Sequence, residues 1–304
     1  MDTPGLNRRK FVAALSLGTA HLLFHNHTLA ANRPARSTDP LQVVSLGRSG
    51  LRTTLIGIGT GVHAGNRSSA LTRRGHDTAV GVIRHAYDRG IRFFDCADTY
   101  GTHPVVGQAL KHIDREKVTV CSKIWVLGGG IPEPERPDAD IVVERFRKEL
   151  DTDYLDTVQI HCMVDPDWTD SQKRQMDILD NLKSKGIIRA HGVSVHSLDA
   201  MKKAAETPWA DVVHVRINPY GIAMDKPNPE EVVKVIAQLH ETGKGVIGMK
   251  LIGNGKYQDD SQKIDHALKF VLGLGVVDMM IVGFETTGQI DDYLNRTENA
   301  LKTA

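Results

Sequence analysis

The chain has 304 residues, with 38 lysines and arginines against 37 aspartates and glutamates, so its formal net charge is only +1. This balance argues against the clustered basic surface on which nucleic-acid and membrane-surface binding depend. The length suits one large barrel or two small domains. Cys96, Cys121 and Cys162 are widely spaced, which fits neither a zinc-ligand spacing nor an even disulfide framework.

The first forty residues differ from the rest of the chain. Arg8 and Arg9 precede an apolar run over residues 11–24, and small residues follow at positions 28–31. A charged start, a short apolar middle and a small-residue cleavage site are typical of a secretory signal. The paired arginines are typical of the twin-arginine type.

We therefore predict a signal peptide over residues 1–31 and a polar linker over residues 32–40. The twin-arginine export machinery is then an expected partner, and the periplasm is the expected location. The alternative is an uncleaved amphipathic helix with a chance arginine pair. No cysteine lies near the cleavage site, so a lipid anchor is not expected, and no stretch after residue 40 is long and apolar enough to span a bilayer.

From residue 41 onward, short β-rich runs alternate with longer amphipathic patterns. Residues 43–46 and 51–54 flank a glycine-containing turn, which is typical of a β-hairpin. Eight further strands are predicted at residues 55–60, 91–97, 118–124, 155–161, 188–196, 212–218, 245–253 and 279–284. Apolar residues three and four apart predict helices between them, most clearly at residues 78–89, 141–150, 172–185 and 230–241.

The alternation of strands and helices predicts a parallel sheet. Eight such units in this length indicate a closed (β/α)8 barrel, the TIM-barrel fold, with the hairpin capping its bottom. No linker divides residues 41–304, so we predict one domain. The competing architecture is an open doubly wound sheet with a dinucleotide loop at residues 57–61, but this segment lacks the third glycine and the helix that should follow.

Reactive groups of such barrels lie at the carboxyl ends of the strands. Asp95 lies late in the second predicted strand, Tyr100 in the loop after it, Lys123 near the end of the third strand and His161 at the end of the fourth. Asp95, Lys123 and His161 come from adjacent strands, so we expect them to converge at one mouth, next to the loop that carries Tyr100. Each residue taken singly has a structural explanation as a turn, an ion pair or a core histidine.

Together the four side chains suit the reduction of a carbonyl group by hydride transfer from a nicotinamide. Tyr100 would protonate the carbonyl oxygen, and the charge of Lys123 would lower the pKa of the phenol from its usual value of about 10. Asp95 would hold Lys123 in its charged form, and neutral His161 would orient the carbonyl oxygen through a hydrogen bond.

Strand alternation also places the cysteines. If Asp95, Lys123 and His161 point inward, Cys96 and Cys162 should point outward under the helices, whereas Cys121 should face the barrel interior. We expect all three to behave as small hydrophobic side chains.

Several segments resemble the aldo/keto reductase family, and the resemblance runs from about residue 41 to the end of the chain. The segments that carry it are residues 90–101, 122–125, 154–161, 192–196 and 283–294. The resemblance implies a catalytic tetrad of Asp95, Tyr100, Lys123 and His161, and NAD(H) or NADP(H) as the cofactor. The implied substrate is an aldehyde, a ketone or a sugar.

The resemblance also implies a set of cofactor-binding residues at the strand ends and at the start of the last helix. These are Gly59, Thr60, Ser194, His214, Met249, Lys250, Gly283, Phe284, Glu285 and Gln289. Lys250 would meet a phosphate as a point charge.

Some of these positions depart from the commoner family pattern. His214 stands where a glutamine often holds the carboxamide, and Met249 replaces the usual stacking aromatic residue. Glu285 is acidic where relatives carry a basic residue, which favours NAD over its 2′-phosphorylated form. Arg296, two turns further along the last helix, is expected to lie too far away to help.

The substrate pocket is expected to be walled by Trp125, Met163 and Trp168, which follow strand ends and are apolar enough to line a pocket. Alternatively, all three side chains could anchor their loops on the rim of the barrel. The sequence leaves the substrate and the oligomeric state open.

Two other functions remain possible. Asp95, His161, His196 and His214 could bind a catalytic metal, which would make the protein a metal-dependent hydrolase. Lys123 and Tyr100 would then be unexplained, and the ammonium would repel the metal, so no metal is expected. The third possibility is a barrel that binds the cofactor only as a sensor or accessory subunit.

Overall fold

A computed structural model describes residues 37–303 of the chain. The predicted signal peptide at residues 1–31 and most of the predicted linker at 32–40 lie outside the described residues. Of the helices within residues 37–303, none combines the length and the apolar character that a membrane span requires.

The described chain opens with an antiparallel hairpin of β1 (Val43–Ser45) and β2 (Arg52–Thr54). Leu46 and Leu51, which flank the turn, are buried against Phe93, Cys121 and other side chains of the barrel interior. The turn is also tied to the segment that precedes a later strand, because the Arg48 amide donates to the Gly243 carbonyl at 2.7 Å. The hairpin therefore plugs the amino-terminal end of the barrel, as predicted.

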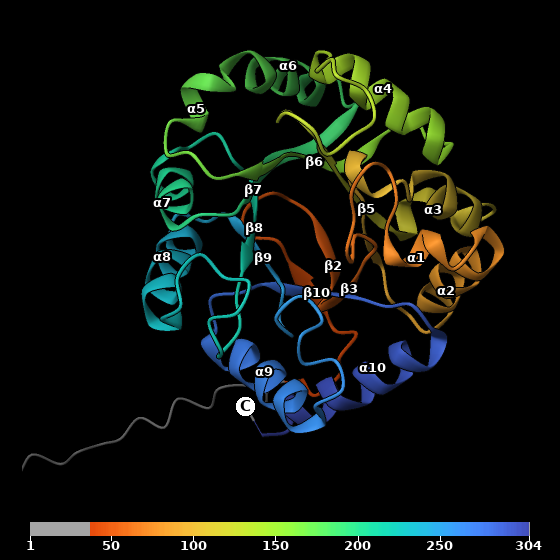
Figure 1. Cartoon of the computed structure of the whole chain (residues 1–304), viewed down its shortest axis with the longest axis vertical. Helices are drawn as coiled ribbons and strands as arrows, with labels where there is room; N and C mark the ends of the chain where they lie inside the picture. The colour runs from red at the N-terminus through yellow and green to blue at the C-terminus, as the bar shows by residue number, and fades with distance from the viewer. Residues whose placement is uncertain (1–36, 304) are drawn as a thin grey trace, which may run out of the picture. The chain divides into compact units, whose positions relative to one another are not determined.

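Eight parallel strands close into the barrel seen in Figure 1. They follow one another in chain order around the ring, and the last strand pairs with the first. Their bounds are β3 Ile56–Gly59, β4 Phe93–Asp95, β5 Thr119–Ile124, β6 Leu155–Met163, β7 Ile188–Val195, β8 Val212–Arg216, β9 Gly245–Met249 and β10 Met279–Gly283. The predicted barrel is confirmed.

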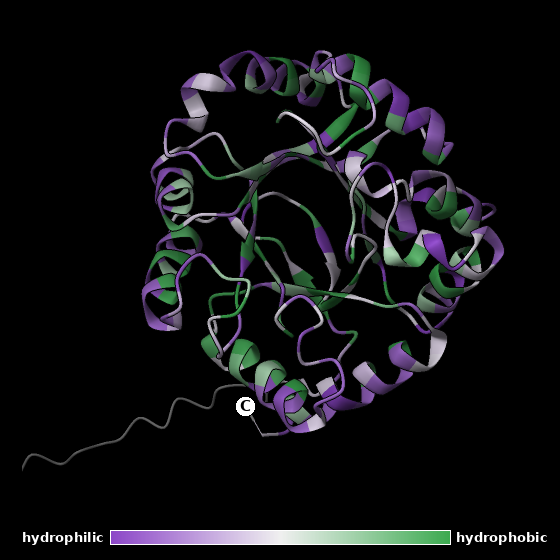
Figure 2. Cartoon of the chain, in the orientation of Figure 1, coloured by the Kyte–Doolittle hydropathy of each residue, from purple (hydrophilic) through white to green (hydrophobic). Residues whose placement is uncertain are grey.

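Helices form the outer ring of the barrel, and in Figure 2 their ribbons carry both hydrophobic and hydrophilic segments. Their apolar residues, such as Val82, Ile83 and Ala86 of α2, are buried against the strands. The bounds are α1 Ala70–Arg73, α2 His76–Asp88, α3 His103–Leu110, α4 Ala139–Leu150, α5 Trp168–Ser171, α6 Lys173–Ser184, α7 Leu198–Glu206, α8 Pro229–Glu241, α9 Ser261–Leu274 and α10 Thr287–Leu301. Two 3-10 turns, η2 Asp98–Tyr100 and η3 Arg115–Lys117, complete the set.

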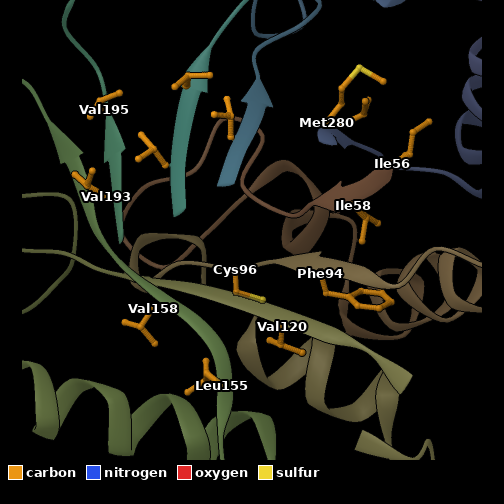
Figure 3. Packing of buried hydrophobic residues seen from close by; sticks show 14 of the residues in the cluster. Ile56, Ile58, Phe94, Cys96, Val120, Leu155, Val158, Val193, Val195 and Met280 are labelled. Carbon is orange, nitrogen blue, oxygen red and sulfur yellow. The ribbon is translucent and has the colours of Figure 1, made fainter. Parts of the chain in front are cut away.

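Strand alternation divides the core into two layers. Phe94, Cys96 and Val120 point outward into the layer between barrel and helices, where Figure 3 shows them. Phe93 and Cys121 point inward and belong to the barrel interior. The predicted directions of Cys96 and Cys121 are confirmed.

The prediction for Cys162 was wrong, because β6 is irregular near its end. The pairing of β6 with β7 shifts register between Ile160 and Met163, and Cys162 takes a left-handed φ of 64°. This extra residue interrupts the alternation. The Cys162 thiol consequently lies at the mouth, partly buried, with its Sγ 3.3 Å from Nδ1 of His196.

The seventh strand of the barrel, β9, also ends earlier than predicted, at Met249 rather than residue 253. Lys250, Gly253 and Asn254 take left-handed φ values of 62°, 63° and 59°, which no continuing strand allows. The segment after β9 is therefore a turn-rich loop over the mouth.

Candidate active site

Asp95 and Lys123 form a buried ion pair at the ends of β4 and β5. The Lys123 ammonium donates to the Asp95 carboxylate and, at 3.0 Å, to the Cys96 carbonyl. Burial disfavours both charges, but their mutual attraction prevails: the pKa of Asp95 lies well below its usual range and that of Lys123 is raised. The pair is therefore charged at neutral pH.

Strand β3 holds this pair in place from its other side. The Thr60 amide and hydroxyl both donate to the Asp95 carbonyl, at 3.1 and 2.7 Å. The Thr60 hydroxyl also contacts the Thr102 hydroxyl at 2.7 Å. Thr60, a predicted cofactor contact, is 1% exposed and fixes the backbone around Asp95 instead.

Tyr100 lies in the η2 turn directly after β4. Its ring lies flat against Gly61, where an added Cβ would come within 2.3 Å of the ring. The Lys123 Nζ is 5.2 Å from the centroid of the ring, and the His161 ring is 5.6 Å from it. Tyr100, Lys123 and His161 therefore converge at one mouth, as predicted.

The pKa of Tyr100 differs from the sequence-based expectation. The charge of Lys123 lowers it, as predicted, but burial raises it by more, and Asp95 adds to the rise. The net effect is a pKa above the usual value of about 10. Tyr100 is therefore a protonated phenol at neutral pH, which is the form that a proton donor needs.

Ionic contacts fix the Tyr100 turn from outside the barrel. Buried Asp98 accepts from Arg67 Nε at 3.1 Å and from Arg145 Nη2 at 2.8 Å. Gly101 follows Tyr100 with a φ of 67°, and an added Cβ would lie 1.9 Å from the Arg67 carbonyl oxygen. The turn is thus fastened to the first loop and to α4.

His161 ends the inward-facing row of β6 and is a neutral imidazole. Burial and the nearby charge of Lys123 hold its pKa well below its usual value. Its Nδ1 has no hydrogen-bond partner among residues 37–303. The Trp125 ring meets it edge-on at 5.2 Å between centroids. A neutral imidazole beside the Tyr100 ring can donate a hydrogen bond to a carbonyl oxygen.

His214 does not lie where the cofactor prediction placed it. The side chain is fully buried beneath the mouth, with Nε2 3.2 Å from the Asp95 carboxylate and Nδ1 2.8 Å from Oε1 of Gln159. Burial and the charge of Lys123 lower its pKa. His214 therefore supports Asp95 from below, a role that its place in the sequence could not reveal.

A long cavity with a volume of about 240 Å³ opens beside these residues. Asp95 and Tyr100 lie at one end, and the start of α10 lies at the other. Six predicted cofactor residues line it: Gly59, Met249, Lys250, Gly283, Glu285 and Gln289. Thr60, Ser194, His214 and Phe284 are buried outside this lining, although the Ser194 hydroxyl has no hydrogen-bond partner among the described residues.

The far end of the cavity contains charges that sequence reasoning missed or dismissed. Arg296 lines the cavity, contrary to expectation, and its guanidinium pairs with Asp292 and Asp265 at 2.7 and 2.6 Å. Glu285 faces Arg74 of the first loop at 3.6 Å. Helical spacing could have predicted that Arg296 faces the cavity, because it lies seven residues after Gln289 and so on the same face of the helix.

Two of the three residues predicted to wall the substrate pocket, Trp168 and Met163, are buried in the protein instead. Trp168 is fully buried and donates through Nε1 to the Ala200 carbonyl at 3.3 Å. Met163 is buried in the layer between barrel and helices, because it follows the β6 bulge. Trp125, which contacts His161, remains a candidate pocket residue.

The geometry also tests the predicted metal alternative. Within residues 37–303, the ligand atoms that cluster are those of Asp95, Cys121 and His214. His161 and His196 are not part of this group. The ammonium of Lys123 already donates to Asp95, where a cation would have to bind. The arrangement therefore suits a proton-transfer site better than a metal centre.

Comparison with known proteins agrees with this reading. A family model described as the aldo/keto reductase family matches residues 55–267. The chain is 26% identical to "Probable aldo-keto reductase 1" of Glycine max over 71% of this chain and 60% of that protein. It is 25% identical to an "NADH-specific methylglyoxal reductase" of Escherichia coli over 61% of each.

Among solved structures, an aldo/keto reductase of Klebsiella pneumoniae in complex with NADP and acetate superposes with a TM-score of 0.60. It is 19% identical, and the match covers 86% of this chain and 90% of that one. The chain spans between 49% and 62% of the length of three curated relatives. The family model covers more than half of the chain, and the chain belongs to the aldo/keto reductase family.

Proposed function

We propose that this protein reduces an aldehyde, ketone or sugar carbonyl to an alcohol with NADH or NADPH. The observation that carries the proposal is the convergence of Tyr100, Lys123 and His161 beside the cavity. The names of the relatives support a nicotinamide of either kind, because one is NADH-specific and another is in complex with NADP.

The residues present fit a nicotinamide dinucleotide. The cavity combines apolar side chains such as Met249 and Leu251 with polar and charged groups such as Lys250 and Gln289, as ligand sites do. The amino end of α10, with Thr286 as its N-cap, lies next to the cavity residues Glu285 and Gln289 and suits an anionic group.

A bound reduced nicotinamide supplies the hydride in this class of reaction. As the carbonyl oxygen gains negative charge, the Tyr100 phenol gives it a proton, and neutral His161 holds the oxygen by a hydrogen bond. The ammonium of Lys123, 5.2 Å from the ring centroid, stabilises the phenolate that remains. Asp95 keeps Lys123 charged, and solvent reprotonates Tyr100 through the open mouth.

Turnover of a carbonyl panel tests this function. Purified protein should oxidise NADH or NADPH only when a carbonyl compound is added, with one alcohol formed per cofactor consumed. Cofactor binding without any turnover would contradict the reductase and would favour the accessory or sensor barrel.

We also propose that the protein is exported through the twin-arginine route. The support is the order of Arg8, Arg9, the apolar run at residues 11–24 and the small residues at 28–31. Replacing both arginines with lysine should leave unprocessed precursor in the cytoplasm. Unchanged mature protein in the periplasmic fraction would reject this route.

A further inference from the structure

Lys250 follows β9 directly and stands at the mouth of the barrel. Its left-handed φ of 62° turns the chain out of the strand and into the loop that covers the cavity. The side chain is partly buried and lines the same cavity as Asp95 and Tyr100. A group bound to Lys250 would therefore share the space in which the carbonyl is reduced.

Among the described residues, the ammonium of Lys250 has no carboxylate partner. Its Nζ donates to the neutral Asn254 side chain at 2.8 Å, and no carboxylate of residues 37–303 lies within 4 Å of it. The other cations at this mouth are compensated. Lys123 pairs with Asp95, and Arg216 donates to Asp225 through Nε at 2.7 Å.

The surroundings of Lys250 also disfavour its charge. Burial lowers the pKa of Lys250, and the positive charges of Arg216 and Lys123 lower it further. Together with burial and Arg216, the charge of Lys250 lowers the pKa of His196 to about 3. A ligand anion would relieve this excess of positive charge.

The anion could come from the cofactor or from the substrate. Lys250 follows Met249, which pairs with Arg216 of β8, and the Arg216 guanidinium donates to the carbonyl of His196, whose ring lies 6.4 Å from that of His161. Glu285 and Arg296 line the cavity from α10 and the turn before it. This placement favours the substrate, and it differs from the sequence-based assignment of Lys250 to a cofactor phosphate.

We propose that the natural substrate is a carbonyl compound that carries a carboxylate or phosphate group, and that Lys250 binds this group. The inference rests on the proposed reductase function. Lys250 is then a specificity residue: it selects the anionic substrate and does not take part in hydride or proton transfer.

Matched substrates of equal carbon number test the proposal. Succinic semialdehyde would be compared with butyraldehyde, and glyceraldehyde 3-phosphate with glyceraldehyde, for the wild type and for Lys250→Met. Lys250→Arg keeps the charge, and Lys256→Met removes an exposed lysine from the same loop as a control. Dissociation constants of NADH and NADPH would be measured for each variant by cofactor fluorescence.

The wild type should favour at least one acidic substrate over its neutral partner. Lys250→Met should lower kcat/KM for that acidic substrate about tenfold or more, with little change for the neutral one and little change in cofactor binding. Lys250→Arg should keep most of the preference, and Lys256→Met should keep all of it.

Two results would overturn the inference. One is a wild type that reduces neutral substrates as well as or better than acidic ones. The other is a Lys250→Met variant that loses activity equally on both and binds the cofactors more weakly, because Lys250 would then serve the cofactor. Absence of any carbonyl turnover by the wild type would instead reject the proposed function itself.

Discussion

Burial dominates the behaviour of single residues at this site. Desolvation raises the pKa of the half-buried Tyr100 above its usual value, although the charge of Lys123 lowers it. The same burial keeps His161 neutral. The consequence is a phenol that stays protonated and an imidazole that stays uncharged throughout the neutral pH range, so reduction of a neutral carbonyl compound should show no loss of rate up to about pH 9.

Glu285 is the residue on which cofactor preference is expected to depend. Its carboxylate lies at the α10 end of the cavity, 3.6 Å from Arg74. A carboxylate there repels a 2′-phosphate and accepts a hydrogen bond from a ribose hydroxyl. We predict relaxed or NADH-leaning binding, with a penalty of about 1 kcal/mol for the phosphate at this exposed rim.

Dissociation constants for NADH and NADPH, measured at the same ionic strength, check this expectation. Glu285→Gln should shift the ratio toward NADPH. If the wild type binds NADPH more than tenfold tighter than NADH, Arg74 rather than Glu285 governs the site.

At the scale of elements, the η2 turn determines where Tyr100 lies. It is fastened through Asp98 to Arg67 and Arg145, and Gly101 lets the Arg67 carbonyl approach closely. The barrel strands position Asp95 and Lys123, whereas this turn positions Tyr100, the proposed acid.

Gly101→Ala should therefore damage both stability and activity. The new Cβ would lie 1.9 Å from the Arg67 carbonyl oxygen in a left-handed conformation, so the turn must move. We expect a loss of about 1–3 kcal/mol in unfolding free energy and a marked fall in kcat.

Gly50→Ala is the matched control. Gly50 also has a left-handed φ, of 79°, but nothing lies within 4 Å of an added Cβ. It should lose about 1 kcal/mol of stability and keep its kcat. Equal kcat values for the two variants would show that the turn does not position Tyr100.

At the scale of the whole molecule, three buried histidines and the half-buried His196 should make the barrel sensitive to acid. Burial lowers the pKa of His103, His161, His196 and His214 below the unfolded value of about 6.5. Below pH 6.5 the unfolded chain binds protons that the folded chain does not, so stability that is fully present above this pH is lost as the pH falls.

For His196, with a folded-state pKa of about 3, the loss between pH 7 and pH 5 is about 2 kcal/mol. Urea unfolding at a series of pH values measures this decline, and His196→Gln should show a smaller one. A flat profile from pH 7 to pH 5 would mean that these imidazoles are not buried as neutral groups.

The sequence was sufficient for the barrel, its hairpin plug and the placement of the four reactive side chains, because strand ends in a closed barrel must meet at one mouth. It was insufficient where a contact between segments far apart in the chain determines the position of a side chain. The irregularity in β6 places Cys162 at the mouth. His214 lies beneath the mouth because it contacts Asp95 and Gln159. Trp168, at the start of α5, is fully buried. These three depend on packing that no local spacing encodes.

The most direct test of the account is the turnover of Tyr100→Phe at matched cofactor saturation. The variant lacks the hydroxyl of the proposed proton donor while its ring keeps the packing against Gly61, so cofactor dissociation constants should be unchanged. Carbonyl reduction should fall about 100-fold or more. Tyr87→Phe in α2, a residue that does not line the cavity, is the control and should keep full activity. Undiminished turnover by Tyr100→Phe would contradict the assignment of Tyr100 as the acid.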